Sequence, residues 1–159
     1  MPEEITVRAE AADSLIAARL VDAMVTEMDQ LYAQGPGRGV GSGASPSDFS
    51  PPTGAFLVIY ADGKPVAGGG LKRDEDGVAE IKRMYVAPAA RRQGLGRRLL
   101  EELEEKAREL GYVRIRLDTG NRQPHAQAMY ESAGYRPIGN FNANPVASFW
   151  GEKRLASDR

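Results

Sequence analysis

Apolar and polar residues alternate along the chain with two different periods. The two-residue period and the residue types typical of strands predict strands at residues 5–10, 55–60, 65–71, 78–86, 112–118, 135–138 and 148–155. The three-to-four spacing typical of helices begins near residues 14, 94 and 124. This order of elements predicts an α/β (α+β) domain, in which helices flank a mixed, mostly antiparallel central sheet of about six to seven strands.

Caps, breakers and apolar stripes support these elements. Asp13 or Ser14 is placed to cap the first helix, and Gly35-Pro36 is expected to end it. The apolar stripe of that helix comprises Ile16, Leu20, Met24, Met28 and Leu31. The stripe of the second helix comprises Leu95, Leu99, Leu103, Ala107 and Leu110. The strand at 112–118 is expected to place Val113, Ile115 and Leu117 on one side.

Residues 35–54 form a long segment that is rich in glycine, proline and serine. These three residue types occupy 14 of its 20 positions, and Val40 and Phe49 are its larger apolar side chains. Such a composition contains too little apolar surface to form a core. A flexible insertion is the first interpretation, and a loop that contacts substrate is the second. We expect residues 1–159 to form one domain that carries this loop.

Composition excludes several classes of function. The 21 basic and 22 acidic residues give a net charge of −1, so neither nucleic acid nor an anionic membrane is expected as a partner. The chain contains no cysteine and one histidine, which argues against disulfides, an enzyme thioester and a metal site. No apolar segment follows the first residues or approaches the length of a membrane span. The sequence therefore predicts a cytoplasmic protein.

The strongest local signal is Arg91-Arg92-Gln93-Gly94-Leu95-Gly96, which joins the predicted strand at 78–86 to the second helix. A helix N-terminus presents amide groups without intrahelical partners and a partial positive charge, and glycines let an anion approach the backbone. Arg97 and Arg98 add positive charge. A phosphate group is thus a suitable ligand, although an ordinary helix start with solvated arginines is the alternative.

A dinucleotide-binding site does not fit this context. Asp118 lies 22 residues after Gly96, where a ribose ligand would be expected, but the third glycine of that fingerprint is missing. The strands before the glycines also form an antiparallel meander, and a dinucleotide-binding unit requires parallel strands.

Two motifs resemble those of the GNAT superfamily of N-acetyltransferases. Arg91-x-x-Gly94-x-Gly96 follows Val86-x-Pro88 and resembles the acetyl-CoA signature. Ala126-x-x-Met129-Tyr130-Glu131-x-x-Gly134-Tyr135 resembles the second motif of that superfamily, and the resemblance spans residues 55–135. It implies a GNAT-like fold and transfer of an acetyl group from acetyl-CoA to a primary amine whose identity the sequence does not give.

The resemblance also implies which residues contact the coenzyme. Main-chain groups of Met84 and Val86 would pair with the pantetheine arm, and Gln123 or Asn121 would replace the asparagine that is usual in the family. The implied coenzyme-binding residues are Met84, Tyr85, Val86, Arg91, Arg92, Gln93, Gly94, Leu95, Gly96, Arg97, Asn121, Gln123 and Tyr130. One observation comes from the residues and not from the resemblance. The alternation of side chains along the strand at 78–86 places Ile81 out of phase with Met84 and Val86, which is the pattern that a β-bulge produces. Such a bulge would free main-chain amides from the strand ladder, and these amides could stabilise an oxyanion. The alternative is that Met84 and Tyr85 are only packing residues.

Two catalytic residues follow from the same resemblance. Tyr130 matches the tyrosine that protonates the departing thiolate, and packing in the core is its alternative role. Glu80 resembles the general base of the histone-acetylating branch, and a solvated strand glutamate paired with Lys82 or Lys72 is the alternative. Asp118 is the other candidate for the base.

Other features leave further alternatives open. His125, at the start of the short helix, is expected to be a solvated polar residue. The Asn140–Pro145 turn, together with the 35–54 loop, is expected to contribute to specificity. A non-catalytic acetyl-CoA sensor or interaction module is the competing function. A homodimer formed through the last strands would also be consistent with the sequence.

Overall fold

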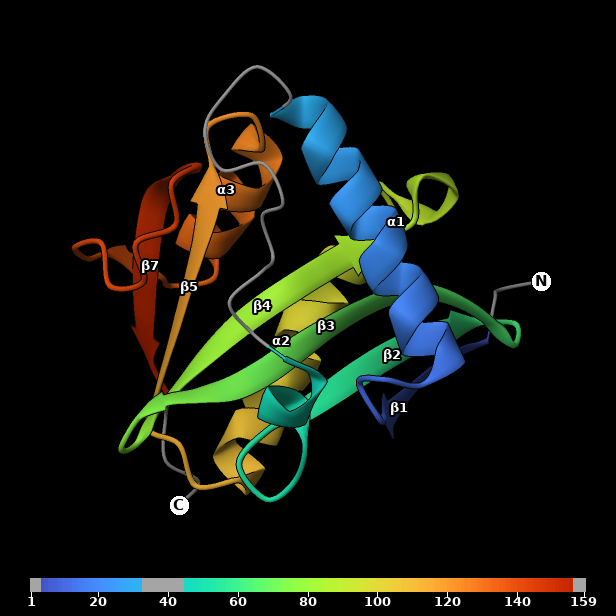
Figure 1. Cartoon of the computed structure of the whole chain (residues 1–159), viewed down its shortest axis with the longest axis horizontal. Helices are drawn as coiled ribbons and strands as arrows, with labels where there is room; N and C mark the ends of the chain where they lie inside the picture. Colours follow the sequence, from blue (N-terminus) through green and yellow to red (C-terminus); the bar gives the residue numbers. More distant parts are fainter. Residues whose placement is uncertain (1–3, 33–44, 156–159) are drawn as a thin grey trace.

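A single mixed sheet forms the centre of the domain in the computed structural model, which describes residues 4–32 and 45–155. Within these residues the sheet has seven strands in the order β1-β2-β3-β4-β5-β7-β6 (Figure 1). The strands are β1 Ile5–Glu10, β2 Ala55–Ala61, β3 Lys64–Glu75, β4 Val78–Val86, β5 Arg114–Gly120, β6 Arg136–Pro137 and β7 Ala147–Arg154. All neighbouring pairs are antiparallel except β4 with β5. The predicted fold class is confirmed.

Helices cover both faces of this sheet (Figure 1). The helix α1, Leu15–Leu31, lies across β2, β3 and β4 on one face, whereas α2, Leu95–Glu109, packs on the opposite face. The third helix α3, Pro124–Ser132, contacts β5 and β7. Two short 3-10 helices, η1 Pro46–Phe49 and η2 Pro88–Ala90, complete the described part of the chain. No helix in that part is long and apolar enough to cross a membrane.

The main hydrophobic core lies between the sheet and α2. Leu99, Leu100 and Leu103 are fully buried there, while the opposite side of α2 carries charged residues. Burying each leucine contributes about 1.5–3 kcal/mol, so α2 is fixed firmly against the strands. A smaller apolar cluster lies under α1. Ser14 precedes the first residue of this helix, and its Oγ accepts a hydrogen bond from the Ala17 amide at 3.1 Å. Ser14 is therefore the cap of this helix.

Several predicted boundaries are corrected by the structure. The third strand extends to Glu75, and β6 contains just two residues. The strand expected at 112–118 begins at Arg114, and the Val113 side chain is 52% exposed. The reason is that Val113 uses its backbone in a junction: its amide donates to the Gly77 carbonyl, and its carbonyl accepts from the Leu155 amide, both at 2.8 Å. The last predicted strand begins and ends one residue earlier than expected.

The second half of the loop expected at 35–54 is anchored to the sheet. Phe49 is 1% exposed, and its ring meets that of Phe56 edge-on at a centroid distance of 6.3 Å. Gly70 makes room for this ring, because a Cβ atom on Gly70 would lie 2.5 Å from it. Residues 35–44, which include Gly35-Pro36 and Val40, lie outside the described residues.

The contact between Gly70 and Phe49 predicts a local steric effect. We expect Gly70→Ala to lower the free energy of unfolding by about 1–3 kcal/mol, because the added methyl group overlaps a ring that is already enclosed. Gly139→Ala is the control, since nothing lies within 4 Å of a Cβ atom there. Chemical denaturation of both variants tests this, and equal stabilities would show that Phe49 moves without cost.

Candidate active site

The parallel strands β4 and β5 separate after a short stretch of pairing. Their ladder joins Val78 to Arg114, Ala79 to Ile115 and Glu80 to Arg116, and it ends there. Beyond this point the two strands diverge towards their carboxyl ends (Figure 1). A cavity of about 110 Å³ lies in the gap and is lined by Met24, Met28, Ile81, Lys82, Arg83, Met84, Asp118, Thr119, Gly120, Gln123, Tyr130, Asn144 and Val146.

A β-bulge occurs in β4 where it borders this cavity. Gly70 pairs with Lys82 and Gly68 with Tyr85, so β4 contains one more residue than β3 between these pairs. Arg83 has a φ angle of 64°, which re-aims the backbone at this position. The bulge inferred from the phase of Ile81 is therefore confirmed. Its consequence is that main-chain groups next to Met84 leave the regular ladder at the wall of the cavity.

The predicted phosphate loop forms an exposed helix N-terminus. Gly94 has a φ angle of 80° and precedes α2, and the first intrahelical bond runs from the Arg98 amide to the Gly94 carbonyl at 3.0 Å. The amides of Leu95, Gly96 and Arg97 therefore belong to the first helical turn and have no intrahelical acceptor. This geometry provides several donors and a partial positive charge for an anion.

The arginines around the loop make specific contacts. The Arg91 guanidinium donates to Glu27 of α1 at 2.6 Å and to the Val86 carbonyl at 2.8 Å. The hydrogen bond to Glu27 raises the pKa of Arg91, and its guanidinium lies 5.6 Å from the centre of the Tyr85 ring. Arg91 thus ties α1 to the end of β4, and its charge is already paired. The packing role considered for Tyr85 agrees with this contact.

Tyr130 lies at the cavity with its hydroxyl group protonated. Its side chain is 7% exposed, and the hydroxyl donates to the sulfur of Met84 at 3.7 Å. Burial raises the pKa of Tyr130, and the nearby charge of Asp118 raises it further. The hydroxyl is therefore a proton donor at neutral pH. Its ring also packs edge-on against Tyr135, so Tyr130 contributes to the core as well.

The two candidate bases, Glu80 and Asp118, are joined by one side chain. The Asn142 amide donates to Glu80 Oε2 at 2.9 Å and also to Asp118 Oδ2. The indole N–H of Trp150 donates to Asn142 Oδ1 at 3.0 Å, which fixes the orientation of that amide. Asn144 adds a second amide to Asp118 at 3.2 Å. The network holds both carboxylates in defined positions.

The surroundings of the two carboxylates differ. Glu80 is 4% exposed and lies 3.8 Å from Lys72 and 3.4 Å from Lys82. The ion pairs expected for Glu80 are therefore confirmed, but the expectation that this glutamate is solvated is wrong, because its side chain is buried in the sheet. Asp118, in contrast, lines the cavity. The structure thus presents Asp118, and not Glu80, directly to a molecule in the gap.

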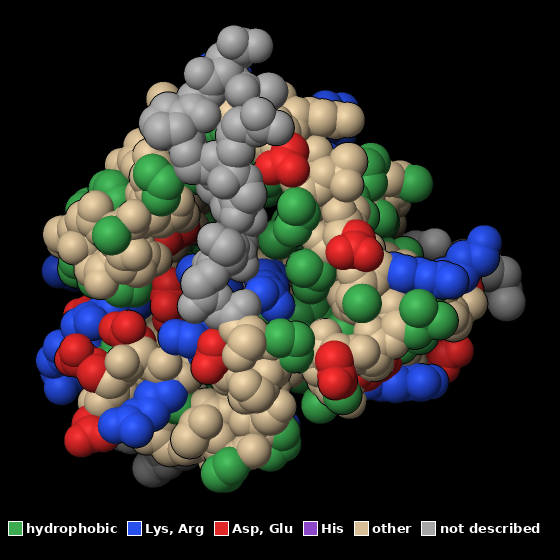
Figure 2. All heavy atoms as spheres, in the orientation of Figure 1, with side chains coloured by type: hydrophobic (Ala, Val, Ile, Leu, Met, Phe, Trp, Pro, Cys, Tyr) green, Lys and Arg blue, Asp and Glu red, His purple; other side chains and the backbone are tan. Residues whose placement is uncertain are grey.

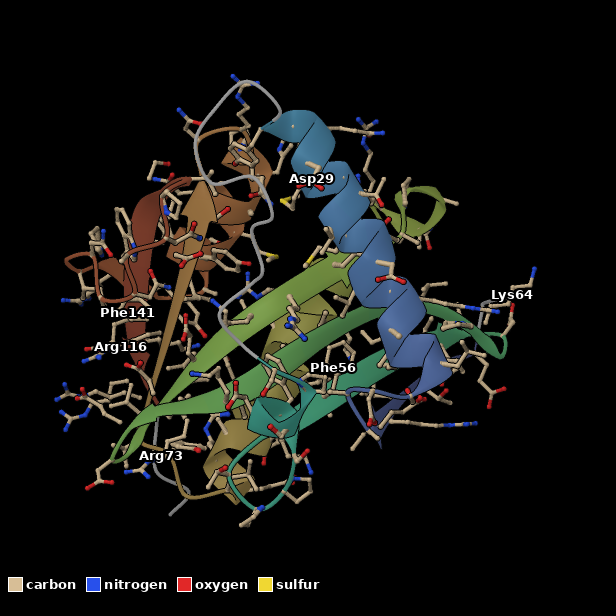
Figure 3. All side chains as sticks on the ribbon, viewed as in Figure 1. Asp29, Phe56, Lys64, Arg73, Arg116 and Phe141 are labelled. Carbon is tan, nitrogen blue, oxygen red and sulfur yellow. The ribbon has the colours of Figure 1, made fainter. Side chains whose placement is uncertain are left out.

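Arg116 of β5 anchors the turn that carries Asn142 and Asn144, through the ring of Phe141. Arg116 of β5 pairs with Glu152 at 2.7 Å and with Asp74 at 2.9 Å. Its guanidinium lies 5.7 Å from the ring of Phe141, and the two side chains are labelled beside each other in Figure 3. The sequence indicated the turn as a specificity element, but it did not indicate the roles of Asn142 and Trp150. The available signal was the repeated asparagine, which suits side-chain hydrogen bonding in turns.

The two candidates for the asparagine position of the family, Gln123 and Asn121, are placed differently by the structure. Gln123 lines the cavity, and its Oε1 accepts from the Tyr32 hydroxyl at 3.3 Å, whereas Asn121 is exposed and is not part of the cavity wall. His125 is exposed, as expected. Among residues 4–32 and 45–155, no group of three or more metal-binding side chains is assembled.

Thr119 provides an independent indication that the cavity receives a ligand. Its side chain lines the cavity and is 5% exposed, and its hydroxyl has no hydrogen-bond partner within the described part of the protein. A buried hydroxyl without a partner costs free energy, so a polar atom of a bound molecule would stabilise it. Sequence reasoning did not identify Thr119.

Known proteins resemble this chain in sequence and in fold. An IAA acetyltransferase of Azospirillum brasilense is 39% identical over 98 residues, which amount to 59% of this chain and 64% of that protein. A Klebsiella pneumoniae protein, provisionally assigned as an acyl-CoA N-acyltransferase, has a TM-score of 0.78 at 29% identity, covering 96% of this chain and 98% of its own.

A third comparison shows the fold in a protein with a bound ligand. PaiA N-acetyltransferase from Thermoplasma acidophilum, in complex with coenzyme A, has a TM-score of 0.69 at 20% identity, covering 95% of this chain and 99% of its own. The matched region is less than two thirds of the Azospirillum protein. The model of the acetyltransferase (GNAT) family matches residues 24–135, which is more than half of the 159 residues. The chain therefore belongs to the acetyltransferase (GNAT) family.

Proposed function

We propose that this protein transfers an acetyl group from acetyl-CoA to a primary amine. The observation that carries the proposal is the cavity between β4 and β5, where a protonated tyrosine and a carboxylate face a main-chain bulge. These are a proton donor, a proton acceptor and amide groups that suit the charges developing in acyl transfer. Membership of the acetyltransferase family supports acetyl-CoA as the donor.

Groups at the start of α2, along β4 and in the cavity would together bind acetyl-CoA. The amides of Gly96 and Arg97 at the start of α2 would bind the pyrophosphate. Beyond Glu80, the edge of β4 that faces β5 is no longer paired with it, and main-chain groups of Met84 and Val86 on this edge would bind the pantetheine arm. The Thr119 hydroxyl would meet a polar atom near the thioester. Arg91 supports the site by holding Val86 and α1 together, because its guanidinium donates to the Val86 carbonyl and to Glu27.

The chemistry follows from the positions of three groups. Asp118 accepts the proton that the ammonium form of the acceptor must lose before it attacks the thioester carbon. The new C–N bond forms as the C–S bond breaks, and amides at the Arg83–Met84 bulge stabilise the carbonyl oxygen. Tyr130 donates its proton to the departing sulfur and regains one from the nitrogen that has attacked, whereas the first proton of the ammonium group, accepted by Asp118, is released to solvent. We assign Glu80 to positioning, because it reaches Asp118 through Asn142.

Tyr130 provides the direct test of catalysis. We expect Tyr130→Phe to lower kcat by about 100-fold or more, because a general acid contributes at least that much. The dissociation constant of acetyl-CoA should stay within about two-fold, since the ring is retained. Tyr135→Phe is the control: its hydroxyl donates to Glu104 at 2.8 Å in the core, so kcat should be unchanged.

Thiol release with a panel of amines and calorimetric titration of acetyl-CoA measure the two quantities. Undiminished turnover in Tyr130→Phe would contradict the assigned role. Tight acetyl-CoA binding without acceptor-dependent thiol release, in the unmodified protein, would instead identify a sensor or interaction module.

Gly94 tests the phosphate loop. We expect Gly94→Ala to weaken acetyl-CoA binding by about 10-fold, the equivalent of one lost charge-assisted hydrogen bond. It should also lower the free energy of unfolding by about 1 kcal/mol, because φ is 80°. Gly63→Ala is a matched control with a φ angle of 82°, and at both positions an added Cβ atom would have no neighbour within 4 Å. Equal acetyl-CoA affinities in the two variants would place the phosphates elsewhere.

Asn142 tests the carboxylate network. We expect Asn142→Asp to lower the free energy of unfolding by about 1–3 kcal/mol, because a donor to two carboxylates becomes a third carboxylate. Asn140→Asp is the control, since Asn140 Oδ1 accepts from the amides of Asn142 and Ala143 and an aspartate retains this function. Denaturation at neutral pH compares the two variants. A neutral effect of Asn142→Asp would show that the bridge does not hold the carboxylates.

A further inference from the structure

Strand β5 directs neighbouring side chains to opposite sides of the sheet where it borders the cavity. Ile115 and Leu117 are buried in the core that the sheet forms with α2, and Thr119 is the next residue of that side. Thr119 also pairs across the ladder with Phe149, which is buried in the same core. Asp118 faces the side of α1, where acidic and basic side chains lie next to one another over the sheet (Figure 2). The two residues therefore border different parts of the cavity.

Tyr130 and Met84 share the side of the sheet on which Thr119 lies. Tyr130 belongs to the core next to α2, Met84 packs against that core, and both line the cavity with Thr119. The Tyr130 hydroxyl donates to the Met84 sulfur at 3.7 Å. The partner of Tyr130 in the unliganded protein is thus a sulfur atom, which shows that a sulfur fits beside this hydroxyl.

The Thr119 hydroxyl lacks the hydrogen bond that its burial calls for. Its side chain is 5% exposed, and the hydroxyl has no partner among residues 4–32 and 45–155. Packing does not require this hydroxyl, because valine has the same shape. A buried hydroxyl without a partner destabilises the unliganded protein, and a ligand atom that accepts its hydrogen bond removes that penalty.

The thioester sulfur is the reacting atom that lacks an assigned donor besides Tyr130. In the proposed reaction the carbonyl oxygen is bound by amides of the β4 bulge, and the amine is deprotonated by Asp118 on the other side of the sheet. A thioester sulfur accepts hydrogen bonds weakly, whereas a thiolate is charged and accepts them strongly. A hydroxyl beside the sulfur therefore binds most strongly as the C–S bond breaks, which is the condition for lowering the barrier.

We infer that Thr119 is a second hydrogen-bond donor to the coenzyme sulfur, acting beside Tyr130 on the thiolate that departs. This inference rests on the proposed acetyl transfer and adds a catalytic residue to it. As the C–S bond breaks, the sulfur keeps the electron pair and takes the proton of Tyr130. Thr119 keeps its own proton and contributes a hydrogen bond alone.

The acidity of the bound coenzyme A thiol tests this contact without turnover. The chain contains no cysteine, so the coenzyme supplies the single thiol of the complex. Coenzyme A that is isotope-labelled next to its sulfur reports the thiol titration by NMR. We expect Thr119→Val to lower the acid dissociation constant of the bound thiol by about 10-fold or more, the equivalent of one hydrogen bond to a charged group. Thr119→Ser retains the hydroxyl and should restore most of this acidity.

Other groups around the cavity also act on the thiol. Lys82 and Arg83 of β4 favour the thiolate, whereas Asp118 of β5 opposes it, and Tyr130 of α3 donates to it. Replacing Thr119 leaves these groups in place, so the difference between the variants isolates the hydroxyl.

Kinetics and stability should respond in opposite directions. At saturating acetyl-CoA and amine, Thr119→Val should lower kcat by about 10- to 100-fold, while the dissociation constant of acetyl-CoA stays within about two-fold. The folding equilibrium constant of the unliganded protein should instead rise by about 5-fold or more, because the unpartnered hydroxyl is gone. A residue that serves packing alone would show no loss of kcat with a gain in stability.

Thr6→Val is the matched control, since Thr6 is an exposed residue of β1 and lies outside the cavity wall. It should leave kcat and the thiol acidity unchanged. Unchanged thiol acidity in Thr119→Val would overturn the inference. A rise in the dissociation constant of acetyl-CoA at constant kcat would do the same, by placing the hydroxyl on another atom of the coenzyme. If no amine supports thiol release, the proposed function fails, and the thiol titration still decides the role of Thr119.

Discussion

The structure depends on a short parallel ladder between β4 and β5. Three residue pairs join the strands at their amino ends, and the rest of each strand turns away from the other. A sheet edge that loses its partner leaves amide and carbonyl groups that need other partners. Here that edge borders the cavity, and the Arg83–Met84 bulge lies on it. The separation of two strands thus creates both the space for a ligand and the main-chain groups that can bind one.

The separated strands are held by α1, which contacts both sides of the gap. On one side Glu27 binds Arg91, which in turn binds the Val86 carbonyl at the end of β4. On the other side, Arg122 donates to the Leu31 carbonyl at 2.7 Å, and the Tyr32 hydroxyl lies against Gly120, where a Cβ atom would overlap it. The gap therefore has a defined width although the two strands do not pair across it. Arg91, which the sequence associated with phosphate binding, therefore helps to hold α1 against the end of β4.

How far the sequence predicts such a site depends on the range of the interactions. The bulge and the helix N-terminus were predictable because phase along one strand and glycines at one helix start are local signals. The role of Arg91 was not, since Glu27 lies 64 residues away and nothing near Arg91 indicates it. The boundary error at Val113 has the same origin, because its backbone partners are Gly77 and Leu155. The bridge made by Asn142 joins three segments, and a pattern within any one of them does not encode it.

The same network explains why the two carboxylates are not equivalent. Glu80 lies between two lysines, so its charge is balanced within the protein. The donors that reach Asp118 from Asn142 and Asn144 are neutral amides, which orient the carboxylate without cancelling its charge. A lysine in place of Asn142 would bring these carboxylates together equally well, but it would compete with an ammonium ligand at Asp118. Because the bridge is an amide, Glu80 can fix the position of Asp118 while the charge of Asp118 stays directed at the cavity.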